Sequence, residues 1–207
     1  MKKLITALLY LTFADVKKMM LRKMRKELPN HLTYHSVHHT EDVLKASIRI
    51  ARSESIKGDD LTLIKTAAVF HDSGFIFGPK DHEERSCDIA RRFLPDYDYS
   101  PMQIEKICGM IMATKIPQKP RNHYEEVLSD ADLDYLGRDD FFTIGNTLYQ
   151  EMIYFGFIKN EDEWNNIQIR FFENHHYFTK TAIESRQAAK EIHLHMIKAA
   201  LHHKKAL

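Results

Sequence analysis

Three short clusters of polar side chains, far apart along the chain, carry the residue types that bind divalent metal ions. The first is Tyr34-His35-Ser36-Val37-His38-His39-Thr40, the second is His71-Asp72 and the third is Ser129-Asp130-Ala131-Asp132. Imidazole nitrogen and carboxylate oxygen together suit manganese, iron, nickel, zinc or magnesium. No thiolate is included, so a catalytic metal ion is favoured over a structural zinc knot.

The doublet His71-Asp72 follows the most apolar segment of the chain. An isolated buried pair of this kind is usually explained by hydrogen bonds within the core. With a histidine of the first cluster and an aspartate of the third, it forms a set of two imidazoles and two carboxylates. An octahedral ion held by these four would keep two positions for water or substrate, as catalysis requires. The third cluster offers Asp130 and Asp132 for the fourth place; the alternative role of Asp130 is to cap a short helix.

Helical periodicity accounts for most of the chain, which has only seven glycines and six prolines. The pattern predicts an all-α protein of about eight or nine helices. The predicted helices run over residues 4–28, from about 40 towards 58, from 60 or 62 to 70, from 81 to 94, from 100 to 112, 127–135, from 139 or 140 to 155, 162–174 and 179–201.

Several helix boundaries are predicted from capping residues. Thr40 is a plausible N-cap for the second helix, and Gly74 is a natural end for the third. Asp81 and Glu84 have the spacing of a capping box. The segment Lys115–Tyr124 contains two prolines and is predicted to be a loop.

The order of these motifs resembles the HD superfamily of metal-dependent phosphohydrolases, over about residues 35–137. The resemblance implies a helical HD bundle in which His39, His71, Asp72 and Asp132 hold the metal ion. It implies one domain over residues 1–207. Its metal-site core would span about 31–137, with the N-terminal helix 4–28 and the C-terminal helices 139–204 packed around it.

His82 resembles the first of the extra histidines that bind a second ion in dinuclear members of the superfamily. The later histidine pair of those members is replaced by Thr114-Lys115-Ile116. This departure implies one tightly held ion. His82 and Glu83, together with Asp130, then become candidates for proton transfer or water positioning. Alternatively, His82 and Glu83 belong to an ordinary exposed helix start.

Lys115 and Arg85 lie close to these motifs in sequence and are candidates for neutralising a phosphate. The alternative is that each is a solvated surface side chain. His35 and His38 are interpreted as residues that support His39 or lie on the surface.

The implied activity is hydrolysis of a phosphomonoester or phosphodiester, with a nucleotide as the expected small-molecule substrate and metal-activated water as the nucleophile. The alternative is a regulatory or scaffold HD domain that binds a nucleotide with little turnover. A complete set of four metal ligands favours the enzyme. A metal-dependent oxygenase on the same fold would need more histidine ligands.

Composition limits the other partners. Thirty basic and 29 acidic residues give a formal charge of +1, so neither nucleic acid nor an acidic membrane is indicated. Cys87 and Cys108 have no zinc or redox spacing, which favours a cytoplasmic location. Residues 1–14 resemble a short signal peptide, but the helical pattern continues beyond them, and a retained first helix is expected. The sequence does not decide between a monomer and a homodimer.

Overall fold

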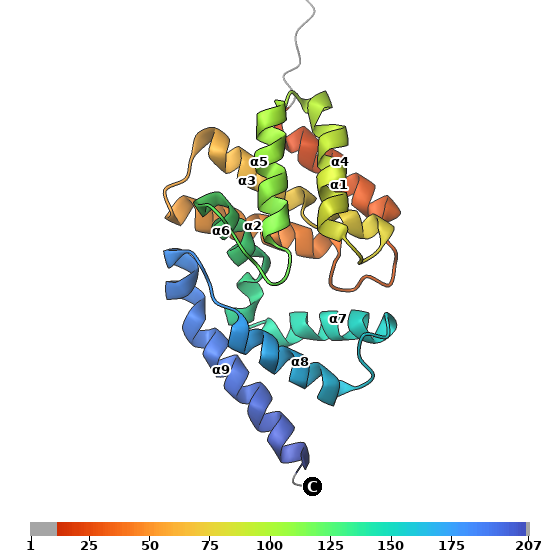
Figure 1. Ribbon diagram of the computed structural model, residues 1–207, viewed down its shortest axis with the longest axis vertical. Coiled ribbons are helices and arrows are strands. Elements are labelled where there is room, and N and C mark those ends of the chain that lie inside the picture. Colours follow the sequence, from red (N-terminus) through yellow and green to blue (C-terminus); the bar gives the residue numbers. More distant parts are fainter. Residues whose placement is uncertain (1–11, 206–207) are drawn as a thin grey trace, which may run out of the picture.

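The computed structural model describes residues 12–205, which form nine α-helices and three short 3-10 helices, with no strand among them (Figure 1). The α-helices are α1 Phe13–Glu27, α2 Val37–Ser53, α3 Gly58–Phe70, α4 His82–Phe93, α5 Pro101–Ala113, α6 His123–Asp132, α7 Phe141–Tyr154, α8 Glu161–Asn174 and α9 Lys180–Lys205. The 3-10 helices are η1 Ser73–Phe77, η2 Leu94–Tyr97 and η3 Asp134–Gly137. The predicted all-α class is confirmed.

The larger hydrophobic core is built by α1 to α6. Helix α3 is its centre, and every residue from Ala67 to Phe70 is completely buried. A helix that is apolar on all sides must be surrounded, and α3 packs against α1, α2, α5 and α6. The doublet His71-Asp72 is therefore delivered to the middle of the protein.

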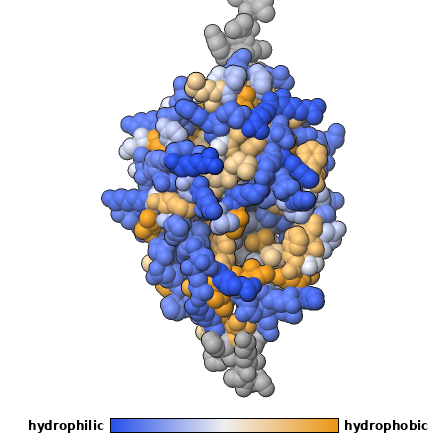
Figure 2. Space-filling model, in the orientation of Figure 1, coloured by the Kyte–Doolittle hydropathy of each residue, from blue (hydrophilic) through white to orange (hydrophobic). Residues whose placement is uncertain are grey.

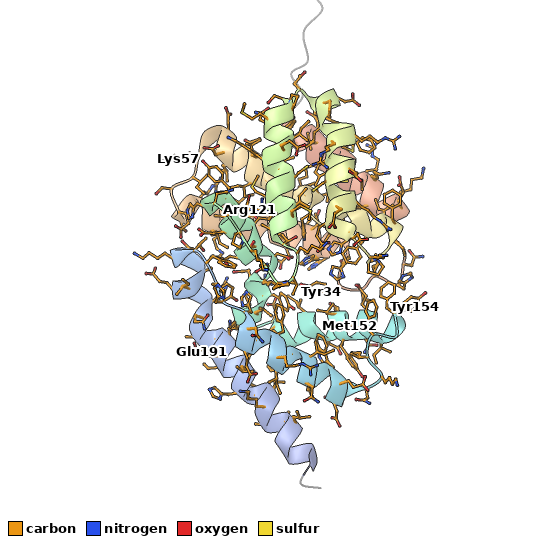
Figure 3. All side chains as sticks on the ribbon, in the orientation of Figure 1. Tyr34, Lys57, Arg121, Met152, Tyr154 and Glu191 are labelled. Atoms are coloured by element: carbon orange, nitrogen blue, oxygen red, sulfur yellow. The ribbon has the colours of Figure 1, made fainter. Side chains whose placement is uncertain are left out.

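A smaller hydrophobic core joins η3, α7, α8 and α9. Its buried members include Leu136, Phe141, Phe172 and Ile197, and Tyr34 reaches it from the segment before α2. Figure 1 shows α7, α8 and α9 below the bundle formed by α1 to α5. Figure 3 places Tyr34 between that bundle and α7. The boundary between the two cores is thus lined by residues from both.

Helix α2 begins three residues earlier than predicted. Ser36 is its N-cap and accepts a hydrogen bond from His39 N at 3.5 Å. Thr40 was predicted to be the cap, but it is fully buried inside the helix, where its hydroxyl donates to Ser36 O. His39 therefore lies in the first turn of α2 and is held by the helix.

The predicted start of the fourth helix is confirmed, because Asp81 is the N-cap of α4. The capping box was wrong, since Asp81 has a left-handed backbone (φ 53°) and its side chain makes no cap hydrogen bond. Helix α6 begins at His123 instead of residue 127, because the Asn122 side chain accepts from Tyr124 N and Glu125 N. The helix ends at Asp132, so the last predicted ligand closes its final turn.

The predicted first helix, residues 4–28, overlaps the described residues only from residue 12 onward. Helix α1 confirms the part of the first helix from Phe13 onward, whereas Leu4, Leu8 and Leu11 lie outside the described residues. Among helices in the described range 12–205, none has the length and apolar character needed to cross a membrane.

Gly137 permits the close contact between η3 and α9. A Cβ at this position would lie 2.3 Å from Arg186 O, which is backbone and has no freedom to move aside. We expect Gly137→Ala to lower the free energy of unfolding by about 1–3 kcal/mol, measured by chemical denaturation. Gly145→Ala is the control, since its nearest neighbours would be 3.9 Å away and alanine favours the helix. Equal stability of the two variants would contradict this account.

Candidate metal centre and adjoining pocket

Three predicted ligands, His39, His71 and Asp72, converge on one point, and Asp132 lies beside the two imidazoles. His39 Nε2 lies 3.1 Å from Asp132 Oδ1 and 3.4 Å from Asp72 Oδ2. His71 Nε2 lies 3.2 Å from Asp72 Oδ2, 3.4 Å from Asp132 Oδ1 and 3.4 Å from His39 Nε2. The start of α2, the end of α3 and the end of α6 therefore bring two imidazoles and two carboxylates together.

These separations fit a bound divalent ion. Ligand atoms about 2.0–2.2 Å from an ion lie roughly 2.8–3.6 Å from one another in octahedral or tetrahedral geometry. His39, His71 and Asp72 are all buried, and Asp72 Oδ2 is a buried oxygen without a hydrogen-bond donor. A buried carboxylate oxygen facing two imidazole nitrogens is the donor set that such an ion would complete.

His71 is fixed in the orientation that a metal ligand needs. Its Nδ1 lies 2.9 Å from Ala68 O, a carbonyl that can only accept, so this nitrogen donates. The same contact holds the ring and directs Nε2 at Asp72 and Asp132. The last turn of α3 thus supplies both the ligand and the group that orients it.

The electrostatics of the cluster favour ionised carboxylates. Burial on its own would raise the pKa of Asp72, but the neighbouring charge of His71 holds that pKa below its ordinary value. Burial would lower the pKa of His71, yet the charges of Asp72 and Asp132 raise it well above its usual range. The carboxylates therefore favour positive charge at this point, which a bound divalent ion would supply.

Gly74 and Ser86 bring the start of α4 against this cluster. A Cβ on Gly74 would lie 2.0 Å from His82 O, so only glycine allows the two segments to meet. Ser86 Oγ accepts from Gly74 N at 2.8 Å and donates to His71 O at 2.6 Å. The glycine after the doublet was predicted to end α3, but α3 ends at Phe70 and Gly74 lies within η1.

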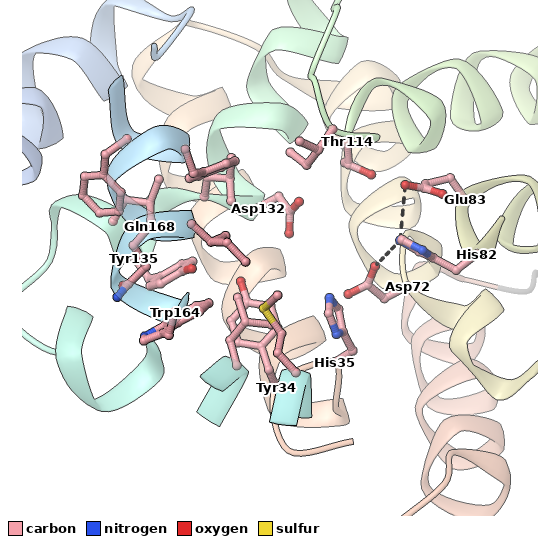
Figure 4. A pocket seen from close by; sticks show the side chains of 18 residues that line it. Tyr34, His35, Asp72, His82, Glu83, Thr114, Asp132, Tyr135, Trp164 and Gln168 are labelled. Atoms are coloured by element: carbon pink, nitrogen blue, oxygen red, sulfur yellow. Dashed lines mark ion pairs between the residues drawn. The ribbon is translucent and has the colours of Figure 1, made fainter. Parts of the chain in front are cut away.

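His82 and Glu83 accordingly lie beside Asp72. His82 Nε2 is 3.6 Å from Asp72 Oδ1 and 3.4 Å from Glu83 Oε1, while its Nδ1 contacts Pro79 O at 3.1 Å (Figure 4). Glu83 is buried. The alternative of an ordinary exposed helix start does not describe this pair, because both side chains face the pocket.

His35 is paired with a carboxylate that the sequence analysis missed. Glu151 from α7 bonds the His35 ring at Nδ1 and accepts from the backbone N–H groups of Tyr34 and His35. The His35 ring also stacks on the ring of Phe75, with the two ring centroids 3.9 Å apart. Glu151 is a buried carboxylate on the same face of α7 as Leu148, and that pattern was the available signal.

Burial would lower the pKa of His35. The hydrogen bond to Glu151 and the charges of Asp72 and Asp132 outweigh burial and raise that pKa. The surroundings of His35 therefore favour the protonated form of its imidazole beside the carboxylate cluster.

Asp130 lies apart from the other candidates. Its two oxygens accept hydrogen bonds from Phe178 N, Thr179 N and Thr179 Oγ1, at 2.7–3.2 Å. Burial raises the pKa of Asp130 to about 6, although these hydrogen bonds lower it. Both oxygens are engaged immediately before α9, so the placement of Asp130 does not support the predicted catalytic role and indicates instead that it holds the start of that helix.

The two predicted phosphate-binding residues also lie elsewhere. Lys115 pairs with Glu84, and Arg85 donates to Phe77 O at 2.6 Å. Neither side chain lines the pocket beside the carboxylate cluster. The interpretation of both as phosphate ligands is not supported by their placement, because each is directed to a partner on the surface.

A cavity of about 230 Å³ opens from the cluster towards α7 and α8. One end is polar, with His35, Asp72, His82, Glu83 and Asp132; the other is lined by Leu133, Tyr135, Leu136, Leu148, Met152, Trp164, Ile167, Phe171 and Phe172. Figure 4 shows the two ends, and Figure 2 shows a hollow bordered by hydrophobic surface between the upper bundle and α7. The pocket therefore lies where the two cores meet.

The fold matches a known architecture. A crystal structure of a predicted HD superfamily hydrolase from an uncultured Thermotogales bacterium superposes with a TM-score of 0.60 and 18% sequence identity, over 90% of this chain and 91% of that chain. No protein family model and no curated protein matches the sequence. This chain therefore shares the all-α fold of that protein, and the resemblance that the sequence motifs indicated is confirmed at the level of the fold.

The neighbouring aspartates Asp130 and Asp132 should give opposite results when truncated. Asp132→Ala should lose most of the one ion per chain that we expect, because it removes a ligand oxygen. Asp130→Ala should keep the ion but lower the free energy of unfolding by about 2–4 kcal/mol, because buried donors lose their acceptor. Elemental analysis and chemical denaturation measure the two quantities. Loss of metal from a stable Asp130→Ala protein would show that the two roles are reversed.

Proposed function

We propose that this chain is a metal-dependent phosphohydrolase that cleaves a phosphomonoester or phosphodiester. The observation that carries the proposal is the meeting of His39 and His71 with the carboxylates of Asp72 and Asp132, with imidazole–carboxylate distances of 3.1–3.4 Å, in a buried site that opens into a pocket. The fold shared with a predicted HD hydrolase supports it. A pure scaffold would have no use for a buried carboxylate oxygen without a donor.

A divalent ion held by these four residues would lower the pKa of a bound water and polarise a phosphoryl oxygen. In the hydrolysis, the water oxygen forms a bond to phosphorus and the ester P–O bond breaks. One water proton stays with the phosphate, and the leaving oxygen must gain a proton to become an alcohol. Manganese, iron, nickel, zinc and magnesium all accept this donor set.

His35 is the residue best placed to supply the proton of the leaving group. It lines the same pocket as Asp72 and Asp132, and Glu151 and Phe75 fix its ring. His82 and Glu83 adjoin Asp72 and are proposed to position the water, or to hold a second, weaker ion. The nucleotide expected from the HD resemblance remains a prediction for the organic part of the substrate.

The activity is tested with p-nitrophenyl phosphate and bis-p-nitrophenyl phosphate. Protein stripped by chelation and then loaded separately with each of the five metals should hydrolyse at least one ester with one of them. His71→Ala should bind little metal and show no turnover, since it loses a ligand. Equal turnover by the stripped protein or by His71→Ala would exclude metal-dependent hydrolysis at this site.

The role of His35 is tested by two variants of its pair. His35→Ala should lower kcat by about 10²–10⁴-fold at unchanged metal content, because the leaving oxygen loses its proton donor. Glu151→Gln keeps an acceptor for the ring, so its loss should be smaller. The double variant should be no slower than His35→Ala alone, because Glu151 acts through the ring. Additive losses would show that Glu151 acts independently of His35.

A further inference from the structure

The pocket beside the metal centre has two chemically different ends. Its polar end carries the cluster of carboxylates and imidazoles. Its other end, here called the apolar arm, consists of Leu133, Leu136, Leu148, Met152, Trp164, Ile167, Phe171 and Phe172. The arm is formed by η3, α7 and α8 together with Leu133, and it is continuous with the cluster that would hold the phosphate (Figure 4). Whatever organic group is attached to that phosphate must enter the arm.

The pocket is poorly suited to a polyphosphate. Over the described residues 12–205, the pocket lining contains no lysine or arginine, whereas it contains the carboxylates Asp72, Glu83 and Asp132. Lys115 and Arg85, the nearest basic residues in sequence, are paired with Glu84 and with Phe77 O. A second or third phosphate group would therefore meet acidic side chains without a cation to neutralise it.

The apolar arm is also poorly suited to a nucleobase. Recognition of a base needs hydrogen bonds to its polar edge, and a buried edge without partners is penalised. Gln168 is the amide side chain of the lining, and its Nε2 already donates to Asn165 Oδ1 at 3.3 Å. Tyr34 and Tyr135, both buried, also line the pocket, with ring centroids 5.7 Å apart and tilted ring planes. Most of the remaining surface offers only contact with apolar groups.

We infer that the substrate is a phosphate ester of an apolar alcohol, with one phosphate at the cluster and an alkyl or aryl group in the apolar arm. This inference rests on the proposed function, because it assumes that the cluster receives the phosphate. Each methylene that enters an apolar site stabilises binding by about 0.8 kcal/mol, which is about 4-fold in affinity. An organic group that fills the arm would therefore be selected over a polar one of similar size.

The experiment uses the manganese-loaded full chain and compares ethyl, butyl and hexyl phosphate with AMP and ATP. The value of kcat/KM should rise about 4-fold per methylene, on the order of 10²-fold from ethyl to hexyl. AMP should be slower than hexyl phosphate, and ATP slower still. A flat alkyl series, or AMP faster than hexyl phosphate, would overturn the inference while leaving the proposed hydrolysis intact.

Binding of ethyl-, butyl- and hexylphosphonate separates this inference from the proposed activity, because their carbon–phosphorus bond resists hydrolysis. If no ester is turned over, the proposed function fails. A chain-length-dependent affinity of the phosphonates would still support the apolar arm, and equal affinities would refute it. Calorimetry measures both the affinity and the negative heat-capacity change expected when apolar surface is buried.

A matched pair of variants locates the effect. Ile167 lines the arm, whereas Ile192 is exposed on α9 and outside the pocket. Ile167→Lys should reduce the preference for hexyl over ethyl phosphate by at least 10-fold, since it puts a cation where the chain would lie. Ile192→Lys should leave that preference and the metal content unchanged. An unchanged preference in Ile167→Lys would place the organic group elsewhere and overturn the inference.

Discussion

The burial of one charged doublet governs the rest of this structure. His71 and Asp72 end the completely apolar turn Ala67–Phe70, at a depth where unpaired charges are strongly unfavourable. Neighbouring groups provide partners for both side chains. Ala68 O orients the imidazole of His71, and His39 and Asp132 contact the doublet from two other helices. A central helix that needed only to fill a core would not require this convergence.

Sequence patterns could place side chains together where chemistry and periodicity agreed. The meeting of His39 and Asp132 could be predicted because their motifs stand out against apolar helices, and the two side chains lie 3.1 Å apart. Tertiary contacts decided what local patterns could not. Asp130 and Asp132 have equivalent local sequence, and only the approach of Thr179 assigns one of them to α9. The carboxylate partner of His35 comes from position 151, 116 residues away, and no short-range pattern encodes that distance.

Tertiary packing also explains why two helix ends were predicted wrongly from local capping preferences. Thr40 is a residue type that is favoured at N-caps, but α2 begins after the N-cap Ser36, and Thr40 is completely buried inside the helix. Glycine is also favoured just after a helix, but Gly74 is needed for a steric reason. The carbonyl of His82 occupies the space that a side chain at position 74 would fill. In both places, packing around the cluster overrode the local preference.

The two hydrophobic cores contribute different parts of the pocket. The helices α2, α3 and α6, which position the candidate metal ligands, belong to the larger core, whereas most of the apolar wall comes from η3, α7 and α8. Substitutions in that wall can alter its shape without disturbing the packing that orients His71. Changes in selectivity are therefore separable from changes at the proposed metal centre. A library restricted to the apolar pocket positions of α7 and α8, with Glu151 kept, could explore new ligands while that centre stays intact.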